Sequence, residues 1–172
     1  MTLPLLALQK ARAFAIKKHA GQRYGHKPYA EHLQDVENVL IRFGVRDLPL
    51  DTCLVLLSAA WLHDILEDTD TSRDDLESKF WSDVANLVWA VTNEDGCNRA
   101  ERHVKTYHKI RTHGVNAVTL KLADRIANTE ACIETNDSRL RMYRKEFPGF
   151  STALFKSGEC EEMWAYLRGL ST

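Results

Sequence analysis

A histidine and three carboxylates follow a strongly apolar segment in the first half of the chain. Residues 53–62 are apolar almost throughout, which is typical of a helix buried on every side. The polar residues that come directly after this segment are His63, Asp64, Glu67 and Asp68. Steps of one, three and four residues put all four on the same side of a continued helix. Because buried unpaired charges are costly and acids at a helix C-terminus oppose the helix dipole, this grouping favours a metal site over a solvent-exposed last turn.

A second polar group forms one stripe along a later apolar segment. Its members are Lys121, Asp124, Arg125 and Asn128, at positions i, i+3, i+4 and i+7. Alone, this stripe would be an ordinary solvated helix face. Small and apolar residues flank it closely, however, and a narrow polar stripe on a mostly apolar helix is more typical of a cleft. The stripe therefore offers Asp124 as a further carboxylate ligand.

His32 is the third element of the candidate site. It lies on the apolar side of a predicted helix with Tyr29 and Leu33, where a single histidine is more often a core residue than a ligand. Together with His63-Asp64 and Asp124, however, His32 is better explained as a metal ligand than as a core residue. Such a mixed nitrogen and oxygen set favours Mn²⁺, Fe²⁺ or Zn²⁺ over a soft metal held by thiolates. The candidate metal ligands are therefore His32, His63, Asp64 and Asp124.

The elements that must position these residues are helices. Apolar residues recur at steps of three and four over most of the chain, and Gly44 is placed to end the helix that carries His32. Ser72 and Ser82 are typical of helix starts. No segment alternates apolar and polar residues as a strand would, so we predict an all-α fold in a single domain over residues 1–172. The predicted helices cover about 2–20, 29–43, 51–68, 72–80, 82–92, 99–113, 115–135, 137–147 and 158–170, with a break at Pro148-Gly149.

Composition narrows the classes of function. The 172 residues carry 23 Lys and Arg against 24 Asp and Glu, a net charge of −1, and 44% of them are hydrophobic. This composition is typical of a soluble globular domain. A near-zero net charge gives no long-range field for a nucleic acid. The longest charge-free apolar stretch near mid-chain, residues 52–62, is shorter than the ~18 residues that a bilayer span needs.

Cysteine usage and the N-terminal segment indicate the compartment. The four cysteines show no C-x-x-C spacing, so we expect reduced thiols. The apolar segment at residues 3–8 is too short for a signal core. We therefore expect a cytoplasmic protein with a small-molecule substrate and with neither a nucleic acid nor a membrane as partner. The oligomeric state is not predicted.

The order of the candidate residues resembles a known family. His32, the adjacent pair His63-Asp64, and Asp124 match the H…HD…D signature of the HD superfamily of metal-dependent phosphohydrolases. Within it, the chain is most similar to the RelA/SpoT-type alarmone hydrolase domain. Several separate motifs in the same order make chance a poor explanation. They lie within about residues 11–131 and include Gly21-Gln22-Arg23, Pro28-Tyr29, His63-Asp64-Ile65-Leu66-Glu67-Asp68-Thr69 and Lys121-Leu122-Ala123-Asp124-Arg125 with Asn128.

The resemblance implies an all-α HD domain that binds one Mn²⁺ through the four candidate ligands. It also implies that Glu67 and Asp68 position and activate the attacking water. The reaction would remove the 3′-pyrophosphate from guanosine tetra- or pentaphosphate. A divalent ion that neutralises phosphate charge beside a carboxylate that accepts a proton is consistent with this chemistry. The chain has room for the hydrolase alone, so it resembles a stand-alone small member, with residues 137–170 as a helical C-terminal extension.

One position departs from the family pattern. Hydrolases of this type usually carry adjacent Arg and Lys after Gly-Gln, whereas this chain has Arg23-Tyr24. We expect Arg23 and Lys27 to contact phosphates and Asn128 to reach the sugar or a phosphate. Tyr143 is a candidate for stacking on the base, although an aromatic residue at this helical spacing is more often a core residue.

Two alternative functions remain open. A residue other than a cation at position 24 favours a broader nucleotide phosphohydrolase, such as a 5′-nucleotidase, that uses the same metal. The other alternative, from a different class, is a nucleotide-sensing module that keeps the HD fold without catalysis. Such a module is expected to have lost ligands or acids, whereas this chain has all four candidate ligands and both Glu67 and Asp68.

Overall fold

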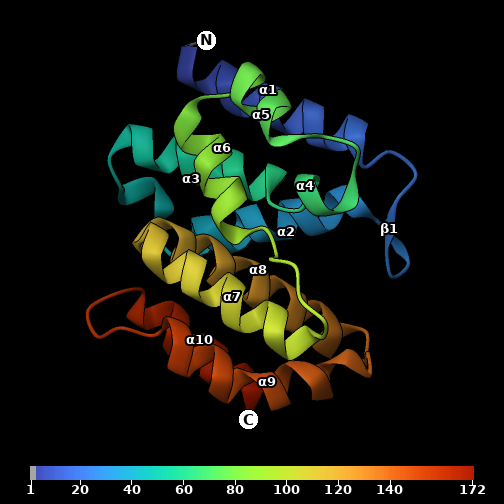
Figure 1. Cartoon of the computed structure of the whole chain (residues 1–172), viewed down its shortest axis with the longest axis vertical. Coiled ribbons are helices and arrows are strands. Elements are labelled where there is room, and N and C mark those ends of the chain that lie inside the picture. The colour runs from blue at the N-terminus through green and yellow to red at the C-terminus, as the bar shows by residue number, and fades with distance from the viewer. Residues whose placement is uncertain (1–2) are drawn as a thin grey trace.

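The computed structural model describes residues 3–172, with side chains from residue 6 onward, so the first residue of the predicted helix 2–20 lies outside it. The fold is all-α, as predicted (Figure 1). Two short strands, β1 (Arg23–Tyr24) and β2 (Lys27–Pro28), and a 3₁₀ turn at Val45–Asp47 accompany the helices. The helices are α1 (Leu3–Lys18), α2 (Tyr29–Arg42), α3 (Leu50–Leu62), α4 (Ile65–Asp68), α5 (Arg73–Lys79), α6 (Ser82–Val91), α7 (Arg99–His113), α8 (Val115–Glu134), α9 (Arg139–Leu154) and α10 (Glu161–Ser171).

Helix α3 forms the centre of one half of the molecule. It packs against α1, α2 and α6 (Figure 1), and every residue from Cys53 to Leu62 is buried. This is the all-round burial that the apolar segment predicts. The residue that follows α3, His63, is therefore delivered to the interior and is only 2% exposed.

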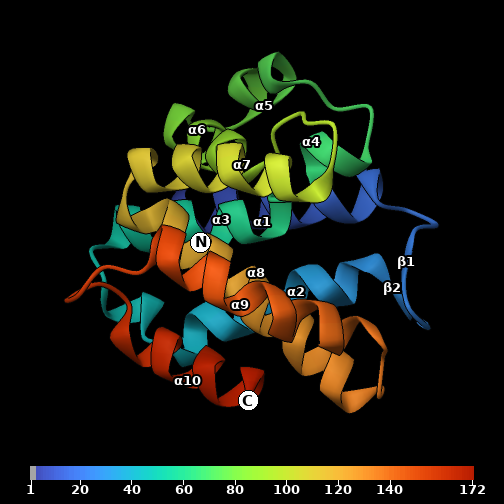
Figure 2. The same cartoon turned by 60° about the horizontal axis from the view of Figure 1, so that its bottom comes forward.

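Helix α8 joins this half to the C-terminal helices. It packs against α2 and α7 and also against α9 and α10 (Figures 1 and 2). Two members of its predicted polar stripe, Asp124 and Arg125, are buried. The stripe thus faces protein, as its narrowness suggests, and α8 presents Asp124 toward α2.

An ion pair with a buried carboxylate helps to fix α2 relative to α1 and α3. The Glu37 side chain on α2 is completely buried and forms a salt bridge with Arg12 on α1. The indole Nε1 of Trp61 on α3 donates to Glu37 Oε2 at 2.9 Å. Three helices therefore meet at one carboxylate, and this contact helps to set the position of the helix that carries His32.

The predicted helix 51–68 is interrupted at His63-Asp64. Helix α3 ends at Leu62 and α4 begins at Ile65. At Asp64 the backbone has φ −96° and ψ −1°, and its carbonyl accepts the first bonds of α4 from the amides of Glu67 and Asp68. Because Ile65 is fully buried whereas Glu67 and Asp68 are exposed, the chain turns where the apolar helix reaches the surface.

The predicted break at Pro148-Gly149 is wrong. Helix α9 continues through Pro148 to Leu154. A proline inside a helix costs about 3 kcal/mol because it removes a backbone hydrogen bond and crowds the preceding turn. Phe150 and Leu154, which follow it, are at most 1% exposed and belong to the hydrophobic core. Their burial, worth ~1.5–3 kcal/mol for each side chain, outweighs the proline penalty.

Two strands of two residues each form a β-hairpin over residues 23–28, where no sheet is predicted. Arg23 pairs with Pro28 and Tyr24 with Lys27 in an antiparallel arrangement. Gly25, between the strands, has φ +60°, a conformation that glycine adopts without steric cost. Strands of this length are too short for an alternating pattern, which is why the sequence does not reveal them.

Other local signals are confirmed. Ser72 caps α5 in a reciprocal capping box with Asp75, and Gly44 follows α2 with φ +81°. Ser82 is the first residue of α6, although Trp81 occupies the capping position. All four cysteines carry free thiols.

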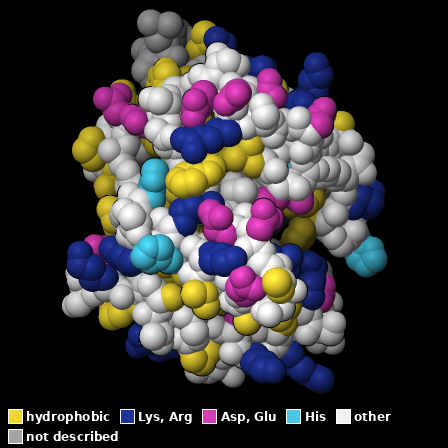
Figure 3. Space-filling model, in the orientation of Figure 1, with side chains coloured by type: hydrophobic (Ala, Val, Ile, Leu, Met, Phe, Trp, Pro, Cys, Tyr) yellow, Lys and Arg dark blue, Asp and Glu magenta, His cyan; other side chains and the backbone are white. Residues whose placement is uncertain are grey.

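The surface carries both signs of charge. On the face in Figure 3, acidic and basic side chains are interspersed within the part of the chain that is described. Among residues 3–172, none of the helices combines the length and apolar character needed to cross a membrane.

Candidate metal centre

The four candidate ligands meet between α2, the α3–α4 turn and α8. The carboxylate Oδ1 of Asp124 lies 3.7 Å from Nε2 of His32 and 3.7 Å from Nε2 of His63. Asp64 Oδ2 lies 3.6 Å from His32 Nε2 and 3.0 Å from His63 Nε2. One ligand atom from each of His32, His63 and Asp124 falls within 4.8 Å of the others. Helix packing thus brings together residues that are 92 positions apart in the sequence.

The orientation of His63 fits that of a metal ligand. Its Nδ1 lies 2.8 Å from the Ala60 carbonyl, so Nδ1 carries the proton and donates it. Its Nε2 is buried and accepts no hydrogen bond from a donor in the described structure, and it faces the Asp64 and Asp124 carboxylates. A backbone carbonyl commonly fixes the tautomer of a metal-bound histidine in this way, and a buried ring nitrogen without a partner is otherwise unfavourable. The site therefore fits a divalent cation.

The charges at the centre are those that a cation requires. Burial alone would raise the pKa of the Asp124 carboxyl, but Lys121 and His63 outweigh it and hold that pKa well below its ordinary value. Burial likewise opposes ionisation of Asp64, and the two imidazoles hold its pKa well below the ordinary value. Both carboxylates are thus ionised, and an ionised carboxylate only accepts.

Lys121 occupies the side of Asp124 that faces away from the histidines. Its ammonium lies 3.0 Å from Asp124 Oδ2, and only 12% of its side chain is exposed. Burial opposes its charge, but the carboxylates of Asp124, Glu67 and Asp64 prevail and raise the pKa of Lys121. Asp124 is therefore held through Oδ2, which leaves Oδ1 toward the histidines.

Asn93, in the α6–α7 loop, donates hydrogen bonds to both oxygens of the Glu67 carboxylate. The backbone amide of Asn93 donates to Oε1 at 2.8 Å, and its side-chain amide donates to Oε2 at 2.6 Å. Surrounding protein desolvates the carboxylate and raises the pKa of Glu67, although Lys121 acts in the opposite direction. The geometry therefore fixes the orientation of Glu67 and makes it a stronger base.

Tyr29 links the second acid to a ligand. Its hydroxyl lies 2.6 Å from Asp64 Oδ2 and 2.8 Å from Asp68 Oδ2. The backbone carbonyl of Asp68 also accepts a bond from Gln22 Nε2 at 2.7 Å. Asp68 is thus held next to the metal centre by the start of α2 and by the loop that precedes it.

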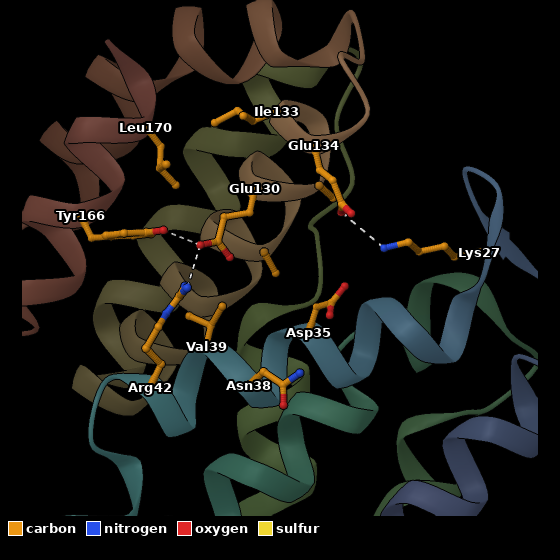
Figure 4. A pocket seen from close by; sticks show the side chains of 12 residues that line it. Lys27, Asp35, Asn38, Val39, Arg42, Glu130, Ile133, Glu134, Tyr166 and Leu170 are labelled. Atoms are coloured by element: carbon orange, nitrogen blue, oxygen red, sulfur yellow. Dashed lines mark hydrogen bonds and ion pairs between the residues drawn. The ribbon is translucent and has the colours of Figure 1, made fainter.

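The predicted substrate residues occupy different places. Arg23 lies in β1 and donates from its guanidinium to the carbonyl of His26, so it braces its own hairpin. Lys27 Nζ pairs with Glu134 at 3.4 Å and lines a cavity of about 500 Å³ between α2, α8 and α10. In Figure 4, Lys27 points toward Glu134, while Arg42 and Tyr166 converge on Glu130. The structure therefore does not bring Lys27 together with the metal ligands.

Asn128 and Tyr143 lie on the other side of the centre. The side-chain amide of Asn128 donates to Asp124 Oδ1 and accepts a hydrogen bond from the Tyr24 hydroxyl. Tyr143, on α9, is half-buried, with the Arg125 guanidinium 4.8 Å from its ring centroid. Both side chains are thus engaged with other residues of the protein.

Sequence reasoning missed two residues that hold the acids, Tyr29 and Asn93. The sequence pattern places Tyr29 on the apolar side of α2, three residues before His32 on the same face, and this spacing is a signal that it lies near the site. Asn93 follows a helix C-terminus in a loop, and no sequence pattern singles it out. Its contact with Glu67 spans 26 positions and depends on how α6 packs.

The fold and this centre define the class of protein. The chain belongs to the HD domain family, whose model matches residues 11–149. The match extends beyond residue 131, where the recognised motifs end, into α9.

Two curated relatives of the chain carry the same enzyme name. The chain is 31% identical over 133 residues to the fruit fly protein "Guanosine-3′,5′-bis(diphosphate) 3′-pyrophosphohydrolase MESH1", covering 74% of this chain and 70% of the relative. It is 34% identical over 125 residues to the human protein of the same name, covering 70% and 66% respectively. A solved structure described as "A metazoan ortholog of SpoT hydrolyzes ppGpp and plays a role in starvation responses" aligns with a TM-score of 0.78, 26% identity and 99% coverage of both chains.

Proposed function

We propose that this protein removes the 3′-pyrophosphate from guanosine tetra- or pentaphosphate by metal-dependent hydrolysis. The observation that carries the proposal is the meeting of four nitrogen and oxygen donors beside an acidic pair in an HD-family chain. The names of the fly and human relatives support this choice of substrate. The ligand of the site is thus a small nucleotide.

Mn²⁺ is the ion that we propose for the centre, held by the two histidines, Asp64 and Asp124. Two imidazoles and two carboxylates suit Mn²⁺ among the divalent transition metals, and the unpaired Nε2 of His63 is a donor without another role. When bound, a divalent ion neutralises charge on phosphate oxygens and lowers the pKa of a water molecule.

We propose that Glu67 and Asp68 orient the attacking water and accept its proton. A carboxylate has about four acceptor sites, so the bonds from Asn93 and Tyr29 leave lone pairs for water. The raised pKa of Glu67 brings it closer to neutrality, where general-base catalysis is most efficient. The Tyr29 hydroxyl, shared between Asp64 and Asp68, holds the second acid at a fixed place relative to the ligand set.

Arg23 is the hairpin cation that we propose to contact the phosphates. It is exposed, and its intrinsic geometry as a planar fork suits phosphate oxygens. Arg23→Ala is expected to raise KM for the guanosine polyphosphate about tenfold or more, the loss of one charged hydrogen bond. Metal content should not change. Steady-state kinetics with parallel metal analysis measure both quantities.

Lys27→Ala is the matched comparison on the facing strand. Because Lys27 already pairs with Glu134 outside the metal centre, its removal is expected to change KM less than Arg23→Ala does. A larger effect at Lys27 would reassign the phosphate contact to that residue. Asn128 remains our proposed contact to the sugar or a phosphate, and Tyr143 our proposed contact to the base.

The product identifies the reaction. We expect Mn²⁺-dependent release of pyrophosphate, and not of single phosphates, from guanosine 3′,5′-bis(diphosphate). Pyrophosphate and orthophosphate are measured separately on a panel that includes nucleoside monophosphates, with and without Mn²⁺. Orthophosphate from monophosphates, without action on the 3′-pyrophosphate, would replace this proposal with the 5′-nucleotidase. Binding without any turnover would favour the nucleotide-sensing module.

A further inference from the structure

Tyr24 contacts the metal centre at two points. Its ring stacks on the imidazole of His32, with centroids 4.6 Å apart and planes inclined by 13°. Its hydroxyl donates to Oδ1 of Asn128, and the amide nitrogen of Asn128 donates to Oδ1 of Asp124. One side chain from the β1 strand thus reaches a ligand on α2 directly and a ligand on α8 through a single amide.

The direction of the two hydrogen bonds that join Tyr24, Asn128 and Asp124 follows from which atoms can donate. The amide nitrogen of Asn128 can only donate, and it faces Oδ1 of Asp124, which accepts. The Asn128 oxygen then faces Tyr24, whose hydroxyl donates to it. With Lys121 at Oδ2, both carboxylate oxygens of Asp124 have a donor. The hydroxyl of Tyr24 therefore helps to keep the amide in the orientation that fixes Oδ1.

Tyr24 is itself held in place from α9 and α2. The Arg139 guanidinium lies 5.0 Å from its ring centroid and is fixed by Asp137 at 2.9 Å. The Tyr29 ring meets Tyr24 edge-on at 6.2 Å. An aromatic ring packed in this way has little rotational freedom, so it can restrict the ring of His32 against it.

We propose that Tyr24 is a positioning residue for the metal centre, acting on His32 through its ring and on Asp124 through Asn128. This role explains an aromatic residue where the family resemblance leads us to expect a second cation. Partners that orient metal ligands typically contribute about 10–100-fold to metal affinity or activity. The proposal rests on the proposed function only for turnover, because metal binding can be measured without a substrate.

Two variants of Tyr24 separate the contribution of its hydroxyl group to Mn²⁺ binding from that of its ring. Tyr24→Phe retains the ring and loses the bond to Asn128, whereas Tyr24→Leu loses both contacts. We expect Mn²⁺ affinity, measured by competition with a chelating dye, to fall about 3–10-fold in the first variant and roughly 10–100-fold in the second. In saturating Mn²⁺, the kcat for guanosine 3′,5′-bis(diphosphate) should recover toward the wild-type value, while KM changes little.

Tyr166→Phe is the matched control, because it removes a hydroxyl that bonds to Glu130 in the separate cavity of Figure 4. Its Mn²⁺ affinity should equal that of the wild type. A double-mutant cycle tests the route: if the hydroxyl acts through Asn128, adding Tyr24→Phe to Asn128→Ala should weaken Mn²⁺ binding no further. Circular dichroism and Tm establish that each variant is folded.

Three outcomes would overturn the proposal. Wild-type Mn²⁺ affinity in both Tyr24 variants would remove Tyr24 from the centre and leave the proposed hydrolase intact. Additive losses in the cycle would show that the hydroxyl does not act through Asn128. Failure of the wild-type chain to bind Mn²⁺ would overturn both this inference and the proposed dependence of the reaction on Mn²⁺. Measured pyrophosphate release then shows separately whether the chain is a hydrolase.

Discussion

Asp124→Ala is expected to abolish stoichiometric Mn²⁺ binding and to lower kcat/KM by at least about 10³-fold, more than the ~10–100-fold caused by losing a partner that only orients a ligand. The variant removes the carboxylate that lies 3.7 Å from Nε2 of both histidines. It also leaves the buried ammonium of Lys121 without its nearest counter-charge, and this ammonium then repels a cation. Atomic absorption on the purified protein measures the metal, and pyrophosphate release measures the activity.

Glu134→Ala is a suitable control for that variant. It removes a carboxylate from the same helix, α8, but at a residue that pairs with Lys27 in the other cavity. Metal content and turnover should stay close to those of the wild type. If Asp124→Ala retained full metal content and full activity, the ligand set would be wrong.

Glu67→Gln and Asp68→Asn are expected to retain the metal and to lose turnover by about 10²–10⁴-fold, the range for removal of a general base. Asn93 holds Glu67 and Tyr29 holds Asp68 beside the four candidate ligands. In Glu67→Gln the new amide nitrogen would also face a donor, because Asn93 donates to both oxygens of Glu67. Single-turnover kinetics in saturating Mn²⁺, together with metal analysis, separate catalysis from binding.

Asp70→Asn provides the comparison for this pair. Asp70 is an exposed carboxylate two residues beyond Asp68, and it pairs with Lys18. Its neutralisation should leave turnover unchanged. Metal loss in both Glu67→Gln and Asp68→Asn, with normal turnover restored by excess Mn²⁺, would reassign the two acids as ligands or scaffold.

Much of the fold was accessible from the sequence because helical periodicity is a local property. The bounds of α5 to α8 differ from the predicted ranges by at most one residue at each end. The buried helix α3 followed from an apolar run that leaves no polar face. The predicted break at Pro148 is wrong because the continuation of α9 depends on a non-local property. The burial of Phe150 and Leu154 is set by distant helices and not by neighbours in the chain.

The candidate centre also has features that the sequence predicts and features that it does not. The residue types and order of His32, His63-Asp64 and Asp124 were sufficient to predict a nitrogen and oxygen ligand set, because ligand chemistry resides in the side chains themselves. The interruption of the helix at His63-Asp64 was not predicted. The two acids that follow the interruption are held by Asn93 and Tyr29.

Spacing within a segment and the order of motifs are sufficient to predict most of the helices, the candidate nitrogen and oxygen donors and the family. The packing of distant helices, in contrast, sets which side chains contact those donors. Tyr24 and Asn128 are 104 positions apart, yet they share a hydrogen bond beside the metal centre. Tyr24 and Lys27 face each other across the hairpin, yet one packs on His32 and the other pairs with Glu134. Such contacts depend on how α2 and α8 pack together, and no local pattern in the chain encodes that packing.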